Sequence, residues 1–182
     1  TQLKKLVEAC SEIPLGMYEC PKPYKRLLST DSIAWMAKNG HFTYFKDTCC
    51  DNKQIRARLR VSRDTRFALF NANTPTGVES LRDGAAGLSP IGANFYPELY
   101  CYIYKHAQKP ESPEFVRVRQ FLEDYDAIVH NHYTFSAKWF LHKRGLPIST
   151  FTRTSVPRVR KEVLSSLEIL LTMMEHLLEL TD

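Results

Sequence analysis

The feature that most constrains this chain is a fourfold alternation of short β-like runs with helical stretches. The predicted strands span residues 15–20, 41–48, 66–71 and 87–93. Apolar residues recur with helical spacing at residues 24–38, 51–61, 77–82 and 97–108. Strands separated by single helices form parallel sheets in which the helices are the crossover connections. The alternation therefore predicts an α/β fold with a parallel sheet.

The remainder of the chain follows helical spacing only, up to an amphipathic stretch at residues 163–178. Four βα units do not close by themselves, because a (β/α)₈ TIM barrel needs eight strands and about 250 residues. We therefore predict that residues 1–108 are the second half of such a barrel. Residues 109–182 are predicted to be a C-terminal helical extension that packs on it. The absence of an initial methionine agrees with a truncated chain.

Composition narrows the function classes. The chain has 182 residues, of which 43% are hydrophobic, and it contains no apolar run long enough for a transmembrane helix or a secretory leader. Its five cysteines include the adjacent pair Cys49 and Cys50 and no CxxC motif. We interpret them as reduced thiols of a cytoplasmic protein, without a disulfide framework or a zinc site, and expect the adjacent pair to be buried.

Basic residues cluster at residues 53–60 and 153–161, and the net charge is +5. A nucleic-acid partner would require such a cationic surface. However, Ile55, Leu59 and Val61 interrupt the first cluster, and 20 acidic residues offset most of the charge. We therefore predict a solvated helix face, and no nucleic-acid or membrane partner.

Lys46 is the most informative residue at a predicted strand end. In barrels of parallel strands, reactive groups stand at the carboxyl ends of the strands. Alternation places Lys46 on the face that carries Tyr44. If that face is the interior, desolvation lowers the lysine pKa and yields a neutral, nucleophilic amine. From spacing alone, a lysine that reaches water and a packed strand aromatic at Tyr18 are the favoured interpretations.

Several motifs, in order, resemble those of the dihydrodipicolinate synthase and N-acetylneuraminate lyase family of Schiff-base (class I) aldolases. Residues 16–21 (GMYECP) are similar to the family's strand that ends in Tyr-Asn-x-Pro. Residues 45–48 (FKDT) are similar to the motif that carries its Schiff-base lysine, at a similar distance from the tyrosine. Residues 84–94 (GAAGLSPIGAN) resemble its Gly-rich block. The resemblance covers roughly residues 10–108.

The resemblance implies a role for each matching residue. Lys46 would attack the keto carbon of pyruvate or another 2-oxo acid and form an imine, so that a C–C bond can be made or broken. Tyr18 would relay protons. Ser89 and Ala93 are expected to bind substrate. No separate cofactor or metal is expected, because the imine is covalent, and self-association into a homotetramer is implied.

Two departures suggest a branch distinct from true dihydrodipicolinate synthases. The position of the family's carboxylate-binding arginine is Pro23, and Glu19 replaces the usual asparagine after Tyr18. The family's Gly-Thr-Thr segment and second tyrosine belong to the first half of the barrel, so the chain alone is not expected to be a competent enzyme. The alternatives are a non-catalytic sugar-acid-binding or oligomeric scaffold and, more remotely, a metal-dependent nuclease suggested by residues 130–132 (HNH).

Overall fold

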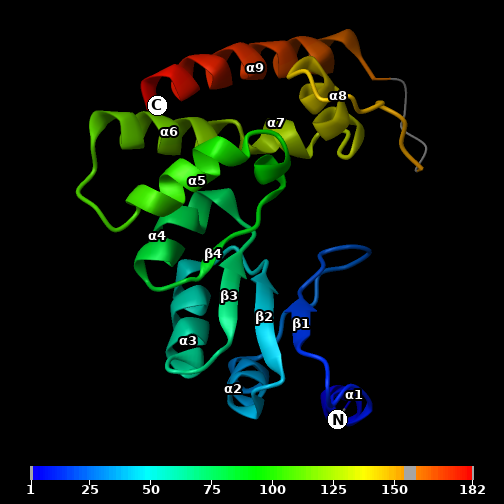
Figure 1. Ribbon diagram of the computed structural model, residues 1–182, viewed down its shortest axis with the longest axis vertical. Coiled ribbons are helices and arrows are strands. Elements are labelled where there is room, and N and C mark those ends of the chain that lie inside the picture. Colours follow the sequence, from blue (N-terminus) through cyan, green and yellow to red (C-terminus); the bar gives the residue numbers. More distant parts are fainter. Residues whose placement is uncertain (1, 154–158, 182) are drawn as a thin grey trace. The chain divides into compact units, whose positions relative to one another are not determined.

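The computed structural model describes residues 2–153 and 159–181 and divides into two compact units, Thr1–Ser89 and Pro90–Asp182 (Figure 1). The predicted boundary after residue 108 differs from this division. Helix α5 (Pro97–His106) lies with the second unit, because it packs on α6 (Pro113–Asp124). Residues 154–158 of the second basic cluster lie outside the described residues.

The first unit is built around a parallel sheet. Its elements are α1 (Gln2–Ala9), β1 (Leu15–Tyr18), α2 (Thr30–Asn39), β2 (Phe42–Asp47), α3 (Asn52–Ser62), β3 (Ala68–Asn71), η1 (Thr74–Thr76), α4 (Gly77–Arg82) and β4 (Gly87–Leu88). The four strands pair in chain order, β1-β2-β3-β4, and every pair is parallel. The predicted α/β class with a parallel sheet is therefore confirmed.

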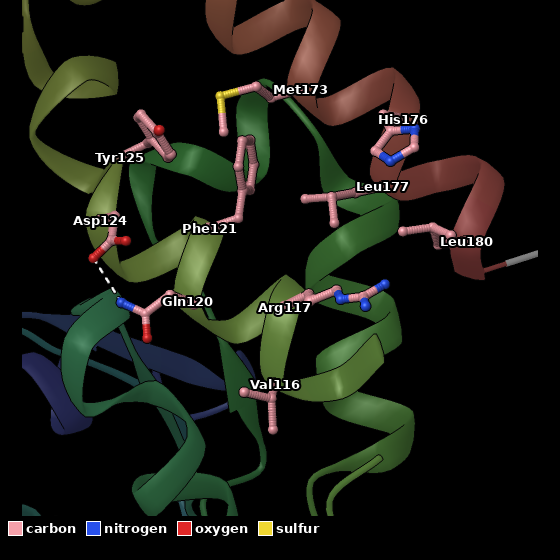
Figure 2. Close-up of a pocket in the computed structure, with 10 residues that line it drawn as sticks. All are labelled: Val116, Arg117, Gln120, Phe121, Asp124, Tyr125, Met173, His176, Leu177 and Leu180. Carbon is pink, nitrogen blue, oxygen red and sulfur yellow. Dashed lines mark hydrogen bonds between the residues drawn. The ribbon is translucent and has the colours of Figure 1, made fainter. Parts of the chain in front are cut away.

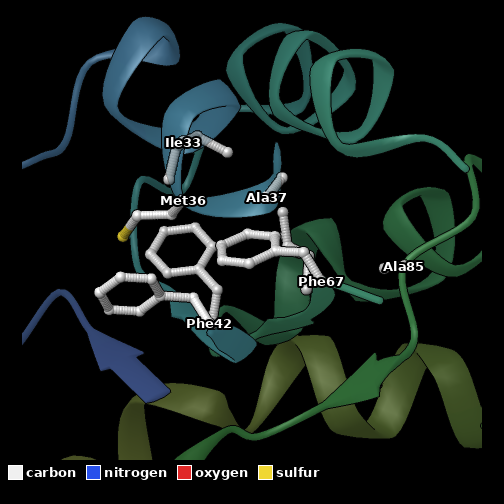
Figure 3. Close-up of a cluster of buried hydrophobic side chains, with 8 residues drawn as sticks. Ile33, Met36, Ala37, Phe42, Phe67 and Ala85 are labelled. Atoms are coloured by element: carbon white, nitrogen blue, oxygen red, sulfur yellow. The ribbon is translucent and has the colours of Figure 1, made fainter. Parts of the chain in front are cut away.

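The two faces of this sheet differ in burial. Alternate residues of β2 and β3, such as Phe45 and Leu69, are buried, and they pack with α2 in a hydrophobic core (Figure 3). The core consists of Ile33, Met36, Ala37, Phe42, Phe45, Phe67, Leu69 and Ala85. The intervening residues Tyr18, Tyr44 and Phe70 remain exposed or half-buried. The crossover helices thus cover one face, as right-handed βαβ connections in a single direction require.

The helix predicted at residues 24–38 begins only at Thr30, because the preceding backbone has other partners. The Leu28 N–H donates to Glu19 Oε1 at 2.6 Å, and the Leu28 carbonyl accepts from Arg58 at 3.0 Å. Ser29 then caps the helix, since its hydroxyl accepts from the Ser32 N–H at 3.2 Å. Tertiary hydrogen bonds therefore replace the first helical turns.

The predicted fourth strand, residues 87–93, was too long. β4 ends at Leu88, and Ile91–Asn94 form the 3₁₀ helix η2. Pro90 has no N–H to continue a ladder. Gly92 lies so close to Tyr100 that a Cβ at this position would approach the phenol oxygen to 2.5 Å, which fixes a compact turn and not a strand.

The second unit is helical. After η2 it contains α5, α6, α7 (Asp126–His130), α8 (Phe135–Lys143) and α9 (Lys161–Thr181). The helix predicted from the spacing of residues 163–178 is confirmed by α9, whose buried residues Leu167, Leu170, Met174 and Leu177 form one stripe. Within the described part of the chain, no helix combines the length and apolar character needed to span a membrane.

Candidate active site

Tyr18 and Lys46 lie side by side at the ends of two neighbouring strands. They are register partners in the parallel pairing of β1 with β2. The Lys46 Nζ lies 4.9 Å from the centre of the Tyr18 ring. Both side chains stand on the sheet face opposite the hydrophobic core, where Tyr18 is 47% exposed and Lys46 is half-buried. The structure therefore brings together the two residues that the motifs had singled out.

The environment of Lys46 favours its neutral form. Partial burial lowers the pKa of Lys46 below its ordinary value of 10.5, and the electrostatic effect of Cys20 opposes this by raising it. The Tyr18 ring acts in the same direction as Cys20, because an aromatic face attracts an ammonium ion. The net lowering leaves more free amine near neutral pH than an exposed lysine has.

Two glycines make room for aromatic rings around this pair. A Cβ on Gly16 would lie 3.3 Å from Tyr44 Cδ1, and a Cβ on Gly87 would lie 2.7 Å from Phe70 Cε1. The Tyr44 and Phe70 rings are 4.9 Å apart between centroids. Since Phe70 is the register partner of both Lys46 and Gly87, these rings form an apolar surface beside the amine.

A cluster of buried charges lies directly behind the pair. Glu19 follows Tyr18, Asp47 follows Lys46, and both side chains point to the core side of the sheet, where they bind Arg58 of α3. The side chain of Arg58 is 0% exposed. Its Nη2 donates to Glu19 Oε1 at 2.8 Å, its Nη1 donates to Glu19 Oε2 at 3.0 Å, and Nη1 also binds Asp47 Oδ2. One guanidinium thus joins both strand ends.

Arg58 keeps its charge in this position. Burial lowers the pKa of a guanidinium, but the hydrogen bonds that Arg58 donates to Asp47 and Glu19, together with the negative charges of these carboxylates, outweigh burial and raise the pKa of Arg58. The guanidinium carbon also lies 5.4 Å from the centre of the Phe45 ring. Of the three guanidinium nitrogens of Arg58, Nη1 and Nη2 donate hydrogen bonds within the described part of the chain, whereas Nε has no partner there. Removing one member of such a buried pair typically costs about 3–5 kcal/mol of stability.

The prediction that residues 53–60 form a solvated helix face is wrong at Arg58. Ile55, Arg58 and Ser62 are the buried residues of α3, and their spacing follows one helical stripe. The helical spacing of these three residues, together with an acidic residue at the end of each of two strands, was the available signal for the cluster. It was missed because an arginine within a basic run is usually solvated.

The predicted substrate-binding residues lie in different units. Ser89 directly follows β4, and its N–H donates to the Asn71 carbonyl at 2.8 Å. This hydrogen bond continues the pairing of β3 with β4 by one residue. Ser89 lies two residues after Gly87. Gly87 pairs with Phe70 of β3, and Phe70 in turn pairs with Lys46 of β2. Ala93 is half-buried in η2 of the second unit. A role for either residue in substrate binding stays a prediction.

The loop after Lys46 is fixed by hydrogen bonds. Asp47 Oδ1 accepts from the Cys49 N–H at 2.8 Å, and Lys25 Nζ donates to the Cys49 carbonyl at 3.5 Å. Cys49 is buried, but Cys50 is exposed with a positive φ of 62°, so the expectation that both are buried is wrong for Cys50. The outward turn at Cys50 precedes Asp51, which caps α3.

A separate groove of about 680 Å³ lies within the second unit, between α6 and α9 (Figure 2). It is lined by Val116, Arg117, Gln120, Phe121, Asp124, Tyr125, Met173, His176, Leu177 and Leu180. Figure 2 shows the Phe121 side chain of α6 near the Met173 and Leu177 side chains of α9. Neither Lys46 nor Tyr18 contributes to its lining.

Metal chemistry finds no support in the geometry of the HNH triplet. His130 ends α7, and its Nε2 lies 3.5 Å from Asp126 Oδ2. The described residues of this unit form helices and loops, whereas a nuclease of this kind needs a ββα frame. Within residues 2–153 and 159–181, no group of three or more His, Cys, Asp or Glu side chains is arranged to hold a metal ion.

Comparisons with known proteins place this geometry in context. A sequence model of the dihydrodipicolinate synthetase family matches residues 2–174. A 4-hydroxy-tetrahydrodipicolinate synthase from Methanospirillum hungatei is 29% identical over 98 residues, which cover 54% of this chain and 34% of that protein. The chain thus matches about a third of the length of this curated relative.

Solved structures share the fold. A chloride-inhibited dihydrodipicolinate synthase from Acinetobacter baumannii, complexed with pyruvate, superposes with a TM-score of 0.80 at 21% identity and covers 96% of this chain. A sialic acid aldolase from Ruminococcus gnavus superposes with a TM-score of 0.81 at 15% identity and covers 98% of this chain. This chain spans 60% of the length of each.

Proposed function

The chain belongs to the dihydrodipicolinate synthetase family, and from this membership we propose that it carries the reactive lysine of a Schiff-base aldolase or lyase. The substrate is pyruvate or another 2-oxo acid. Lys46 is the nucleophile and Tyr18 is the proton shuttle. The observation that carries the proposal is the 4.9 Å separation between the Lys46 Nζ and the Tyr18 ring at adjoining strand ends.

The proposed chemistry follows from these two groups. The neutral Lys46 amine adds to the keto carbon of the 2-oxo acid, and the carbinolamine loses water to form an imine. Protonation of the imine makes it an electron sink, so that either a C–C bond breaks to release an aldehyde and leave an enamine, or an enamine adds to an aldehyde. Tyr18 passes protons to and from the carbinolamine oxygen and the aldehyde oxygen.

We also propose that the four strands form half of an eight-stranded barrel. The exposed or half-buried face that carries Tyr18, Tyr44, Lys46 and Phe70 would then line the barrel interior. Enclosure would remove more water from the Lys46 amine than this chain removes by itself, and would lower its pKa further. We propose likewise that the whole protein is active, that it uses or releases an aldehyde, and that it self-associates.

A trapping experiment tests the proposed function. The natural-length protein that carries this chain is incubated with pyruvate and borohydride, and intact mass spectrometry measures the reduced adduct. We expect one stable adduct, which peptide mapping assigns to Lys46, and its loss in Lys46→Ala. The control is Lys38→Ala, an exposed lysine at the end of α2, which should form the adduct normally.

The opposite outcome is equally informative. No mass gain, or a gain that survives Lys46→Ala, would refute the Schiff-base proposal. A folded protein without an adduct would instead favour the non-catalytic alternative, a sugar-acid-binding or scaffold member of the same family.

A further inference from the structure

The strand residues that follow Tyr18 and Lys46 share one buried partner. Glu19 directly follows β1, Asp47 is the last residue of the adjoining parallel strand β2, and both bind the guanidinium of Arg58. All three side chains are at most 1% exposed. The cluster therefore lies one residue beyond each member of the proposed catalytic pair, on the opposite side of the sheet.

Fixing Glu19 and Asp47 also fixes their neighbours. Successive residues of a strand point to opposite faces, so anchoring one side chain below the sheet sets the direction of the preceding side chain above it. The anchored side chains of Glu19 and Asp47, which face the core, therefore set the orientation of Tyr18 and Lys46 on the opposite face of the sheet.

Three further hydrogen bonds, each with at least one backbone partner, tie the ends of β1 and β2 together. The Glu19 N–H donates to the Lys46 carbonyl at 3.2 Å. Thr48 Oγ1 donates to the Glu19 carbonyl at 2.7 Å, and the Thr48 N–H donates to Glu19 Oε2 at 3.3 Å. The peptide groups on both sides of Asp47 are thus tied to Glu19 at the end of β1, which limits any sliding of one strand end against the other.

We propose that Arg58 is a positioning residue, which sets the separation of the Lys46 amine and the Tyr18 phenol by holding Glu19 and Asp47 together. This inference rests on the proposed function. A planar guanidinium suits the task, because its fork donates to Glu19, Asp47 and the Leu28 carbonyl at once. A lysine ammonium has three donors from a single atom and cannot span these acceptors.

The test is Arg58→Lys in the natural-length protein, which keeps the charge and removes the fork. The rate of adduct trapping with pyruvate and borohydride is measured against pyruvate concentration and expressed per folded molecule. We expect the maximal rate to fall about 10- to 100-fold, since a misplacement of about 1 Å can cost 100-fold. The half-saturating pyruvate concentration should stay within about twofold, because Arg58 is buried away from the open face.

The matched control is Arg56→Lys. Arg56 lies on the same helix and forms an ion pair with Asp83 at 2.7 Å, but its side chain is 53% exposed and touches neither strand end. It should leave the maximal rate unchanged. If Arg58→Lys does not fold, Glu19→Gln is measured in the same way. This substitution preserves the shape of the side chain and weakens its hydrogen bonds with Arg58.

A merely structural role for Arg58 makes different predictions. The variant would be less stable in urea, yet its folded fraction would trap pyruvate at the wild-type rate, and that result would overturn the proposal. A positioning role lowers the plateau of the pH–rate profile without moving its inflection. A moved inflection with an unchanged plateau would also overturn it, because it would indicate an electrostatic effect on the amine.

A crystal structure of the folded Arg58→Lys variant separates this inference from the proposed function. It measures the distance from Lys46 Nζ to the Tyr18 ring without any need for activity. An enlarged separation supports positioning even if the wild-type protein forms no adduct. A separation that stays at 4.9 Å overturns positioning even if the wild-type protein is an active aldolase.

Discussion

Lys46 and Tyr18 are register partners on neighbouring parallel strands, with the lysine Nζ 4.9 Å from the centre of the tyrosine ring. No strand intervenes between β1 and β2, so the pairing of the sheet sets this separation. The amine and the phenol therefore lie close together at the carboxyl ends of the two strands, as proton transfer during imine formation requires.

Tyr18→Phe isolates the phenol hydroxyl from the ring. The ring still lies beside Lys46, but proton relay is lost, and we expect trapping of pyruvate to slow by about 10²- to 10⁴-fold. Tyr44→Phe is the control, because Tyr44 lies on the same face and is 36% exposed. An unchanged rate in Tyr18→Phe, measured by intact mass over time, would remove Tyr18 from the mechanism.

The reactivity of Lys46 should depend on pH in a stated direction. Burial lowers the pKa of Lys46 below 10.5, against the opposing charge of Cys20. Because only the neutral amine reacts, acylation at Lys46 should rise with pH and reach half its maximum below pH 10.5. Cys20→Ser removes the opposing charge and should lower that midpoint further. Site-resolved mass spectrometry measures both, and a midpoint at or above 10.5 would contradict the expectation.

The adjacent cysteines should differ sharply in reactivity. Burial, assisted by the hydrogen bond and charge of Asp47, raises the pKa of the Cys49 thiol to about 12, whereas Cys50 is exposed. The thiolate is the reactive form, so iodoacetamide at pH 8 should modify Cys50 and spare Cys49 in the folded protein. Fragmentation of the labelled peptide distinguishes them, and the unfolded protein, in which both should react, is the control.

Gly87→Ala should destabilise the first unit. The added Cβ would approach Phe70 Cε1 to 2.7 Å, and such overpacking typically costs about 1–3 kcal/mol. Gly77→Ala is the matched control, because its Cβ would meet Leu88 at 3.4 Å, an ordinary contact, and it should be neutral or gain about 0.4–1 kcal/mol. Urea midpoints compare the two, and equal midpoints would argue against the close approach of Phe70.

Two neighbouring residues of α9 test the packing of the second unit. Leu170 is 0% exposed, so Leu170→Ala should cost about 2–5 kcal/mol of unfolding free energy. Ile169 is 59% exposed, and Ile169→Ala should change stability by less than about 0.5 kcal/mol. Denaturation followed by circular dichroism measures the difference. Similar losses in both variants would show that α9 buries a different face.

Much of the fold could be predicted because it depends on local patterns. Alternating burial over residues 44–47 of β2 and the helical stripe of α9 follow periodicities of two and of about 3.6 residues. The α4 bounds predicted from the sequence, residues 77–82, agree with the structure. The fourth strand was overextended, because the close approach of Gly92 to Tyr100 depends on a helix that follows it and not on the local pattern.

The sequence by itself determined the parallel α/β class and the motifs around Tyr18 and Lys46, since both depend on residues close together in the chain. Only the tertiary structure decided that Arg58 is buried and that α2 starts late. Arg58 and Glu19 are separated by 39 positions, and a charged side chain is buried only where distant partners satisfy it. Its burial is therefore a property of the folded sheet and helix together, and no local pattern of charge could specify it.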